Sequence, residues 1–184
     1  MKIGIIGSGG REHAICTFLK ISNKIDKIYC FPGNAGTSFI AENININLNN
    51  FDEIKEKIKE LKIDIIVVGP ERPLVEGIVD FLEKNEIKVF GPNKISSQLE
   101  GSKIFTKKLC EKYKIPTANF GVFEDIEKSL DFLKKCKFPI VVKADGLASG
   151  KGVYICKNFK DAKEASEEIF NGKFGFAKQI LVEE

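Results

Sequence analysis

The chain has 184 residues, of which 43% are apolar, and carries a formal net charge of +3. This apolar content is sufficient for a hydrophobic core and excludes a disordered chain. The small charge, without a Lys/Arg cluster interleaved with aromatic residues, argues against nucleic acid as a partner. No apolar run approaches the ~20 residues that span a bilayer, which argues against a membrane protein. Scattered cysteines without a C-x-x-C pair predict reduced thiols in the cytoplasm, not disulfides or a metal site.

The N-terminal half of the chain alternates between apolar strands and amphipathic helices. Strands are predicted at residues 3–6, 27–31, 43–48, 64–68 and 87–90, and helices at 11–21, 52–61 and 74–85. The strands are apolar along nearly their whole length, as is typical of parallel strands covered on both faces. The alternation predicts a doubly wound, mainly parallel, Rossmann-like α/β sheet that binds ligands at the carboxyl ends of its strands.

Turn-forming loops follow four of these strands, at residues 7–13, 32–37, 69–74 and 91–93. Taken singly, each has a structural explanation, since Gly, Pro and Asn form turns in many proteins. Because the carboxyl ends of parallel strands meet at one edge of a sheet, the loops together favour a small polar ligand there. The residues expected to contact this ligand are Gly9, Gly10, Arg11, Glu12, His13, Asn34, Ala35, Gly36, Thr37, Gly69, Pro70, Glu71, Pro73 and Leu74.

The first of these loops differs from a dinucleotide fingerprint. G-x-G-x-x-G requires a glycine where this chain has Glu12, which argues against an NAD- or FAD-dependent enzyme. The turn at residues 7–10 can still hold a phosphate at the start of a helix, with Arg11 as a bidentate donor. Glu12 has a structural alternative, because an acid in the first turn suits the helix dipole.

The pattern changes after Gly101. A helix is predicted at residues 102–114, with Ser102 as its N-cap, and Pro116 ends it. A strand at 120–123, a helix at 126–136, a hairpin, a helix at 160–170 and a strand at 179–182 follow. We therefore expect a first domain at residues 1–101 and a smaller, partial α+β domain at residues 102–184, which ends directly after a strand.

The hairpin at residues 139–155 (PIVVKADGLASGKGVYI) contains a glycine-rich turn flanked by Lys143 and Lys151. Glycines let backbone N–H groups approach a phosphate closely and form an anion-binding nest. The turn is not a Walker A loop, because Gly146 and Gly150 are one residue too close and Gly152 replaces the Ser or Thr. Residues 153–156 also predict a strand, not a helix. We interpret residues 146–152 as a flap over nucleotide phosphates, with a flexible hairpin without a ligand as the alternative.

Six motifs follow one another along the chain: GxGGREH at 7–13, PGNAGT at 32–37, GPExPLVxG at 69–77, LEGSKxFTK at 99–107, VKADGLASGKGV at 142–153 and VEE at 182–184. Together they resemble those of the glycinamide ribonucleotide synthetases (phosphoribosylamine–glycine ligases), an ATP-grasp family of purine biosynthesis. The flap alone would indicate only the ATP-grasp superfamily. The three N-terminal loops separate this family from carboxylases that share the flap.

The resemblance implies ATP-dependent amide formation between glycine and 5-phosphoribosylamine through a glycyl phosphate, giving glycinamide ribonucleotide, ADP and phosphate. It implies that the three N-terminal loops face phosphoribosylamine. Adenine would meet the backbone of the strand ending at Glu183, where a carboxylate would take the ribose hydroxyls. The residues implied to bind ATP are Lys103, Lys143, Gly146, Ala148, Ser149, Gly150, Lys151, Gly152, Val153, Glu183 and Glu184.

The chain also departs from the family, whose members are more than twice as long. The resemblance therefore implies an N-terminal part, with the Mg²⁺ ligands and the remaining catalytic residues on the missing portion. Glu183 and Glu184 do not predict a metal site, because adjacent strand residues point to opposite faces. We expect the chain alone to be inactive with weak ligand binding. The alternative is a non-catalytic module that binds a nucleotide or a sugar phosphate.

Overall fold

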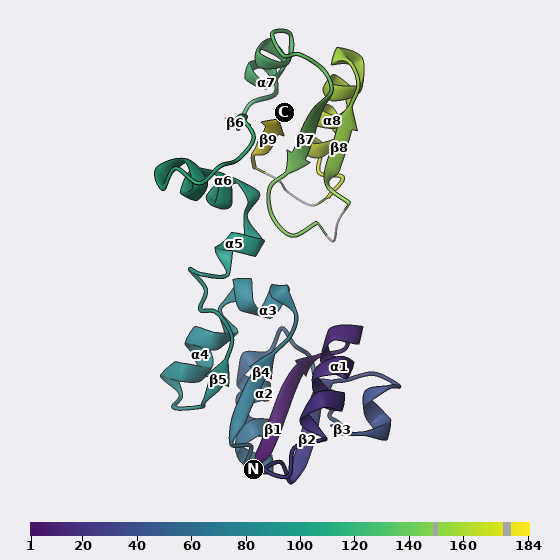
Figure 1. Ribbon diagram of the computed structural model, residues 1–184, viewed down its shortest axis with the longest axis vertical. Helices are drawn as coiled ribbons and strands as arrows, with labels where there is room; N and C mark the ends of the chain where they lie inside the picture. The colour runs from purple at the N-terminus through teal and green to yellow at the C-terminus, as the bar shows by residue number, and fades with distance from the viewer. Residues whose placement is uncertain (149–150, 175–177) are drawn as a thin grey trace. The chain divides into compact units, whose positions relative to one another are not determined.

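The computed structural model describes residues 1–148, 151–174 and 178–184. The chain forms two compact units, Met1–Ser97 and Gln98–Glu184 (Figure 1). The division lies a few residues before the boundary that the change of sequence pattern indicates at Gly101. Each unit is built around one sheet.

The sheet of the first unit is parallel throughout and confirms the doubly wound α/β prediction. Its strand order is β3-β2-β1-β4-β5. The order reverses at β1, which has β2 on one side and β4 on the other, so a ligand crevice is expected at the carboxyl ends of these strands. The strands are β1 (Lys2–Gly7), β2 (Lys27–Pro32), β3 (Glu42–Asn43), β4 (Ile65–Val68) and β5 (Val89–Phe90).

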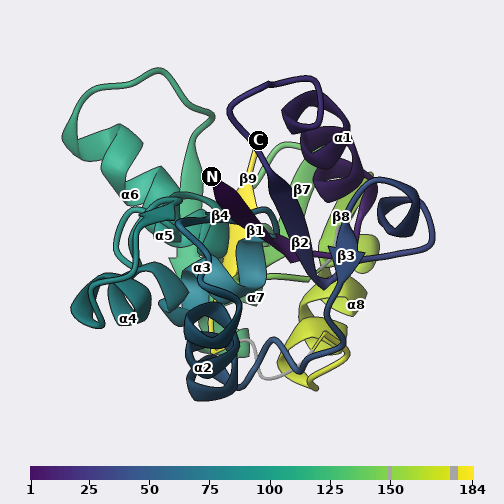
Figure 2. The same cartoon turned by 90° about the horizontal axis from the view of Figure 1, so that it is seen from below.

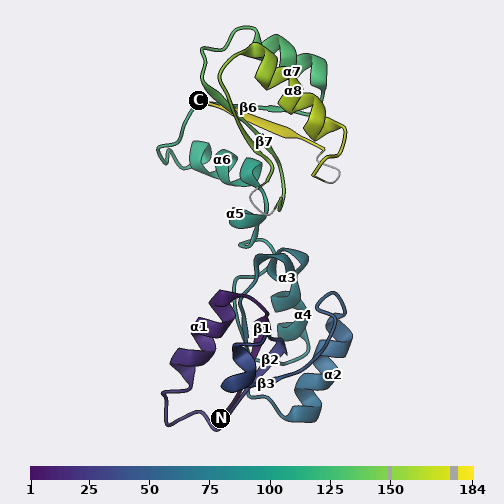
Figure 3. The ribbon, with the colours of Figure 1, turned by 90° about the vertical axis from the view of Figure 1, so that its right-hand side faces the viewer.

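Helices cover both faces of this sheet because successive strand residues point to opposite sides. Ile3 and Ile5 of β1 form a core with Cys16 of α1 (Gly10–Leu19). Ile6 belongs to a second core, which contains the buried residues of α2 (Phe51–Leu61) and α4 (Ile78–Lys84). Figures 2 and 3 show α1 on one side of the sheet and α2 on the other. The short helix η1 (Thr37–Phe39) follows β2.

Three predicted elements of the first unit are wrong in extent. The strand expected at residues 87–90 is formed only by Val89–Phe90. The strand expected at residues 43–48 pairs only over Glu42–Asn43. Its register would place residue 45 opposite Pro32, where β2 ends and where proline has no N–H to donate. The helix expected at 74–85 is two helices, α3 (Glu71–Glu76) and α4, separated by Gly77. Gly77 has φ +100°, a left-handed conformation that ends a helix.

The second unit is α+β, with an antiparallel sheet of order β6-β9-β7-β8. Helices α7 and α8 pack on one face and form its core with alternate residues of β7 and β9. Figure 3 shows α6 on the opposite side of this sheet from α7 and α8. The elements are α5 (Gln98–Gly101), α6 (Lys103–Lys112), β6 (Phe120–Phe123), α7 (Ile126–Leu133), β7 (Ile140–Ala144), β8 (Val153–Cys156), α8 (Phe159–Phe170) and β9 (Ile180–Glu183).

None of the helices in the described part of the chain combines the length and the apolar character required to cross a membrane.

Candidate functional site

The three loops after β1, β2 and β4 are joined by backbone hydrogen bonds at the switch-point edge of the first sheet. Gly33 N donates to Gly7 O at 3.1 Å, and Gly69 N donates to Ile6 O at 3.0 Å. The side chain of Asn34 donates from Nδ2 to Ser8 O at 2.9 Å. The loops therefore form one continuous surface, as their positions after neighbouring strands predict.

Glu12 lies beneath the first loop. Its side chain is buried, and its Oε2 accepts a hydrogen bond from Gly9 N at 2.6 Å. Gly7 has φ +127°, and a Cβ there would lie 2.5 Å from Glu12 Cδ. A larger residue at position 7 would thus be strained and would displace this carboxylate. The geometry gives Glu12 a supporting role in the loop.

Replacing Glu12 by alanine should lower the free energy of unfolding by about 1–2 kcal/mol, because Gly9 N loses its capping acceptor. Urea unfolding followed by circular dichroism would measure the change. Glu76→Ala is the matched control, since Glu76 forms an exposed helical pair with Arg72, worth at most about 0.5 kcal/mol. Equal effects of the two substitutions would contradict the supporting role of Glu12.

A network of polar side chains fixes the second loop. Thr37 is fully buried; its backbone N donates to Asn34 Oδ1 at 3.0 Å, and its Oγ1 lies 2.7 Å from Asn43 Oδ1. Asn43 Nδ2 in turn donates to Asn34 O at 2.7 Å. Asn43 is absent from the sequence-based candidates. A signal was available, because Asn is unusual in a predicted strand.

Arg11 connects the first and third loops. Its side chain is 64% exposed and lies 3.7 Å from Glu71 Oε2. Arg11 Nη1 donates to Gly69 O at 2.5 Å. An open hollow of about 420 Å³ lies between these loops, lined by Gly7, Ser8, Gly9, Gly10, Arg11, Glu12, Leu48, Pro70 and Glu71. Arginine can offer a planar, bidentate donor pair to a phosphate or carboxylate here.

The other candidates of this edge divide between surface and core. His13 and Ala35 are exposed, and a Cβ on Gly36 would lie 3.0 Å from His13 Cε1, so the ring borders the second loop. Pro73 is buried and Leu74 packs against the hydrophobic core. Neither Pro73 nor Leu74 belongs to the lining of the hollow.

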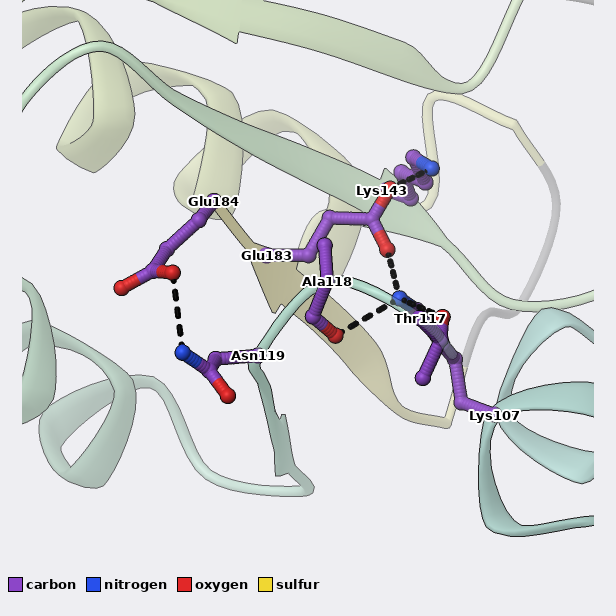
Figure 4. A network of polar contacts seen from close by, with 7 residues as sticks. All are labelled: Lys107, Thr117, Ala118, Asn119, Lys143, Glu183 and Glu184. Carbon is purple, nitrogen blue, oxygen red and sulfur yellow. Dashed lines mark hydrogen bonds and ion pairs between the residues drawn. The ribbon is translucent and has the colours of Figure 1, made fainter. Parts of the chain in front are cut away.

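In the second unit, β7 and β8 form the predicted hairpin, with Lys143 opposite Val153. Lys143 forms an ion pair with Glu183 Oε1 on the adjacent strand β9. Figure 4 shows this pair and a second lysine, Lys107 of α6, on the other oxygen of Glu183. Lys107 Nζ lies 2.7 Å from Glu183 Oε2.

Lys107 is a residue that sequence reasoning missed. Its Nζ donates to Thr117 Oγ1 at 2.7 Å and to Ala118 O at 3.0 Å, and it lies 5.4 Å from the centre of the Phe120 ring. The available signal was its spacing, three residues after Ile104 on the buried side of an amphipathic helix. A lysine on such a face requires a partner.

Two opposing influences act on Glu183. Burial raises its pKa, but the ion pairs with Lys107 and Lys143 outweigh burial, so the net pKa lies below the usual range. The carboxylate is therefore charged at neutral pH.

Lys103 lies at the base of the flap. Its Nζ donates to Ala144 O at 3.0 Å and to Gly146 O at 2.9 Å. Burial is the main cause of its lowered pKa, and the charge of Lys143 contributes in the same direction, against the opposing effect of Asp145. Two predicted ATP-binding lysines are thus close enough in this unit to influence each other.

Asp145 anchors the start of the flap to the N-terminus of α6. Its carboxylate accepts from Ser102 Oγ at 2.9 Å and from Ile104 N at 3.1 Å. Ser102 Oγ also caps the helix by accepting from Phe105 N, as the sequence predicts. A carboxylate at a helix N-terminus is favourable because it faces free N–H groups.

Part of the flap itself is described. Ala144 N donates to Gly152 O at 2.8 Å, and Lys151 N donates to Ala148 O at 2.9 Å. Lys151 and Val153 are exposed, and Gly146 has φ +96° in open space. Ser149 and Gly150, two further candidates, lie outside the described residues.

Glu183 and Glu184 point apart (Figure 4). Glu184 Oε2 accepts from Asn119 Nδ2 at 2.9 Å, away from the lysines. A hollow of about 490 Å³ beside this end of β9 is lined by Asn119, Phe120, Phe132, Lys135, Cys136, Lys137, Ile140, Val182, Glu183 and Glu184. Among residues 1–148, 151–174 and 178–184, no group of three or more His, Cys, Asp or Glu side chains is placed to hold a metal ion.

Two family models match the chain end to end. Phosphoribosylglycinamide synthetase, N domain, matches residues 1–100, and phosphoribosylglycinamide synthetase, ATP-grasp (A) domain, matches residues 101–184. The chain belongs to the phosphoribosylglycinamide synthetase family. This agrees with the resemblance that the six motifs carry.

Relatives in this family are considerably longer than the chain. A phosphoribosylamine–glycine ligase from Caldanaerobacter subterraneus is 47% identical over 185 residues, covering 100% of the chain and 44% of the relative. One from Clostridium acetobutylicum is 47% identical over 189 residues, covering 100% of the chain and 45% of that relative. The chain therefore spans less than half the length of these curated relatives.

Solved structures agree with this assignment. The phosphoribosylamine–glycine ligase of Thermotoga maritima superimposes with a TM-score of 0.79 at 33% identity, over 100% of this chain and 44% of that one. The biotin carboxylase domain of the 2-oxoglutarate carboxylase from Hydrogenobacter thermophilus has a TM-score of 0.78 at 22% identity, over 99% of this chain and 43% of that one. The second likeness concerns the fold alone.

Proposed function

We propose that the chain is the N-terminal part of a cytoplasmic phosphoribosylamine–glycine ligase. It would bind 5-phosphoribosylamine on the loops of the first unit and ATP at the flap of the second. The observation that carries this proposal is the family match, which is continuous over both units. In the complete enzyme, ATP would phosphorylate glycine, and the amine of phosphoribosylamine would displace phosphate from the glycyl phosphate.

The chemistry of the first unit supports a phosphorylated substrate. The hollow combines the start of α1 with the exposed guanidinium of Arg11. Free N–H groups at a helix start and a fixed arginine both favour an anion. Arg11 is held by Gly69 O, which orients it for this purpose. We infer that Gly10 and Arg11 bind the phosphate, with the loop at Asn34–Thr37 alongside, whereas the N–H of Gly9 is already bonded to Glu12.

The second unit supports a polyanionic nucleotide. Lys103 and Lys143 supply two ammonium groups beside the glycine-rich flap, and the buried Glu183 balances only part of the cluster's positive charge. Catalysis would consist of positioning the phosphates and neutralising their charge, without a protein nucleophile. Mg²⁺ would supply further charge neutralisation. Its ligands are expected on the portion that the relatives have beyond this chain.

Arg11→Ala tests whether the sugar phosphate binds to the first unit and ATP to the second. It should weaken binding of ribose 5-phosphate, used as a stable stand-in for phosphoribosylamine, by about tenfold or more, because a charge-assisted contact is lost. ATP affinity should stay unchanged, as measured by calorimetry on the same protein. Loss of ATP binding with retained sugar-phosphate binding would mean that the two sites are exchanged.

A further inference from the structure

The lysine–glutamate cluster of the second unit contains more positive than negative charge. Lys107, Lys143 and Glu183 meet in one buried group, and the Glu183 side chain is only 10% exposed. A buried, charged carboxylate is costly unless it is paired or hydrogen-bonded. Two cations on one carboxylate leave one positive charge free for another anion.

The two lysines are not equivalent. The Lys107 side chain is 11% exposed; its Nζ donates hydrogen bonds to Thr117 and Ala118 and forms an ion pair with Glu183. These partners come from β9 and from the segment between α6 and β6. Lys107 is therefore fixed from several sides.

Lys143 is more accessible, with a side chain 22% exposed. It stands on the same face of the sheet as Glu183, opposite exposed Val153 of the hairpin. The charge of Lys103 acts on the same region. Among the interactions of the described residues, the Lys143 ammonium has Glu183 as its partner. It can turn toward a ligand at the cost of that one contact.

We propose that Lys107 is a positioning residue, the permanent counter-ion of Glu183, and that this frees Lys143 to exchange Glu183 for an anionic ligand. The inference rests on the proposed function, in which that ligand is the phosphate chain of ATP. Without Lys107, movement of Lys143 would leave Glu183 buried, charged and unpaired beside the incoming phosphates. Such a group is costly and repels the anion. Lys107 would thus support ATP binding without touching ATP.

The first experiment needs no ligand. In Lys143→Met protein labelled with ¹³C at the glutamate carboxyls, the Glu183 resonance, assigned by its loss in Glu183→Gln, should titrate as an acid that is ionised at neutral pH. Lys107 alone then neutralises the carboxylate. A Glu183 that is protonated at neutral pH in this variant would overturn the inference.

The second experiment measures ATP affinity by calorimetry. Lys107→Met should weaken ATP binding by about tenfold or more, since truncating one partner of a buried charge pair leaves the other uncompensated. Lys108→Met, an exposed neighbour in the same helix, should have no effect. In the Lys107→Met/Glu183→Gln double variant the carboxylate is neutral, so most of the affinity should return.

The double variant distinguishes positioning from a purely structural role. It lacks the unpaired buried charge, so it folds even where Lys107→Met does not. Affinity that is unchanged in Lys107→Met, or not recovered in the double variant, overturns the inference. If the unaltered chain binds no ATP, the proposed function fails, and the carboxyl titration still decides whether Lys107 is the counter-ion of Glu183.

Discussion

Replacing Lys143 by methionine should weaken ATP binding by about 10- to 100-fold, because a cation–phosphate contact contributes about 1.5–3 kcal/mol. Methionine keeps most of the volume of the lysine stem but not its charge. Lys143 carries the free charge of the cluster, whereas Lys103 is held by the carbonyls of Ala144 and Gly146. Calorimetry with ATP measures the loss.

Lys157→Met is the control for this prediction, since Lys157 is exposed directly after β8. Its affinity for ATP should match that of the unaltered chain. An equal loss of ATP affinity in both variants would indicate non-specific attraction of ATP to a basic surface. An unchanged affinity in Lys143→Met would remove Lys143 from the ATP site.

Glu183→Ala should lower the free energy of unfolding of the second unit by about 3–5 kcal/mol, as is typical when one member of a buried ion pair is removed. Lys107 would then remain buried without a carboxylate to balance its charge. Urea unfolding measures the effect. Glu184→Ala is the matched control, because Glu184 is an exposed neighbour bonded to Asn119, and it should cost less than about 1 kcal/mol.

The contribution of Glu183 to the free energy of unfolding should decrease as the pH falls. Its folded-state pKa is lowered from the usual glutamate pKa of 4.5, because the two lysine pairs outweigh the effect of burial. Its stabilisation is therefore fully present above that unfolded value and is lost as pH falls through the folded pKa. The stability difference between the unaltered chain and Glu183→Gln should shrink below about pH 4.5. A difference that grows with acidity would contradict the ion-pair account.

The fold was largely predictable because its signals are local. Apolar runs separated by amphipathic helices indicate parallel strands, and β1, β2 and β4 all lie where the sequence places them. The failures have long-range causes. Residues 45–48 keep apolar alternation yet leave the sheet because β2 ends in Pro32. The helix predicted at 74–85 is interrupted at Gly77. A single glycine in a helical pattern does not reveal from the sequence that its backbone is left-handed.

The parts of the candidate sites formed by backbone loops could be predicted from the sequence. The partners of buried side chains could be predicted less well. Glycine-rich loops after strands predicted both candidate sites. The burial of Glu12 beneath Gly7 and Gly9, and the pairing of Lys107 with Glu183, join groups that only the tertiary structure brings together. The sequence names Glu12 as a contact residue and gives Lys107 no role. Both side chains support neighbours that face the proposed ligands.

In the proposed function, ATP binds at the hairpin of the second unit. The most direct measurement is a ¹H–¹⁵N NMR titration of the chain with ATP at millimolar concentration. We expect shifts concentrated at Lys103, Lys143, the flap residues 146–152 and Glu183, with the resonances of the first unit's loops unchanged. Shifts confined to the loop at residues 9–13, or no shifts at all, would contradict it.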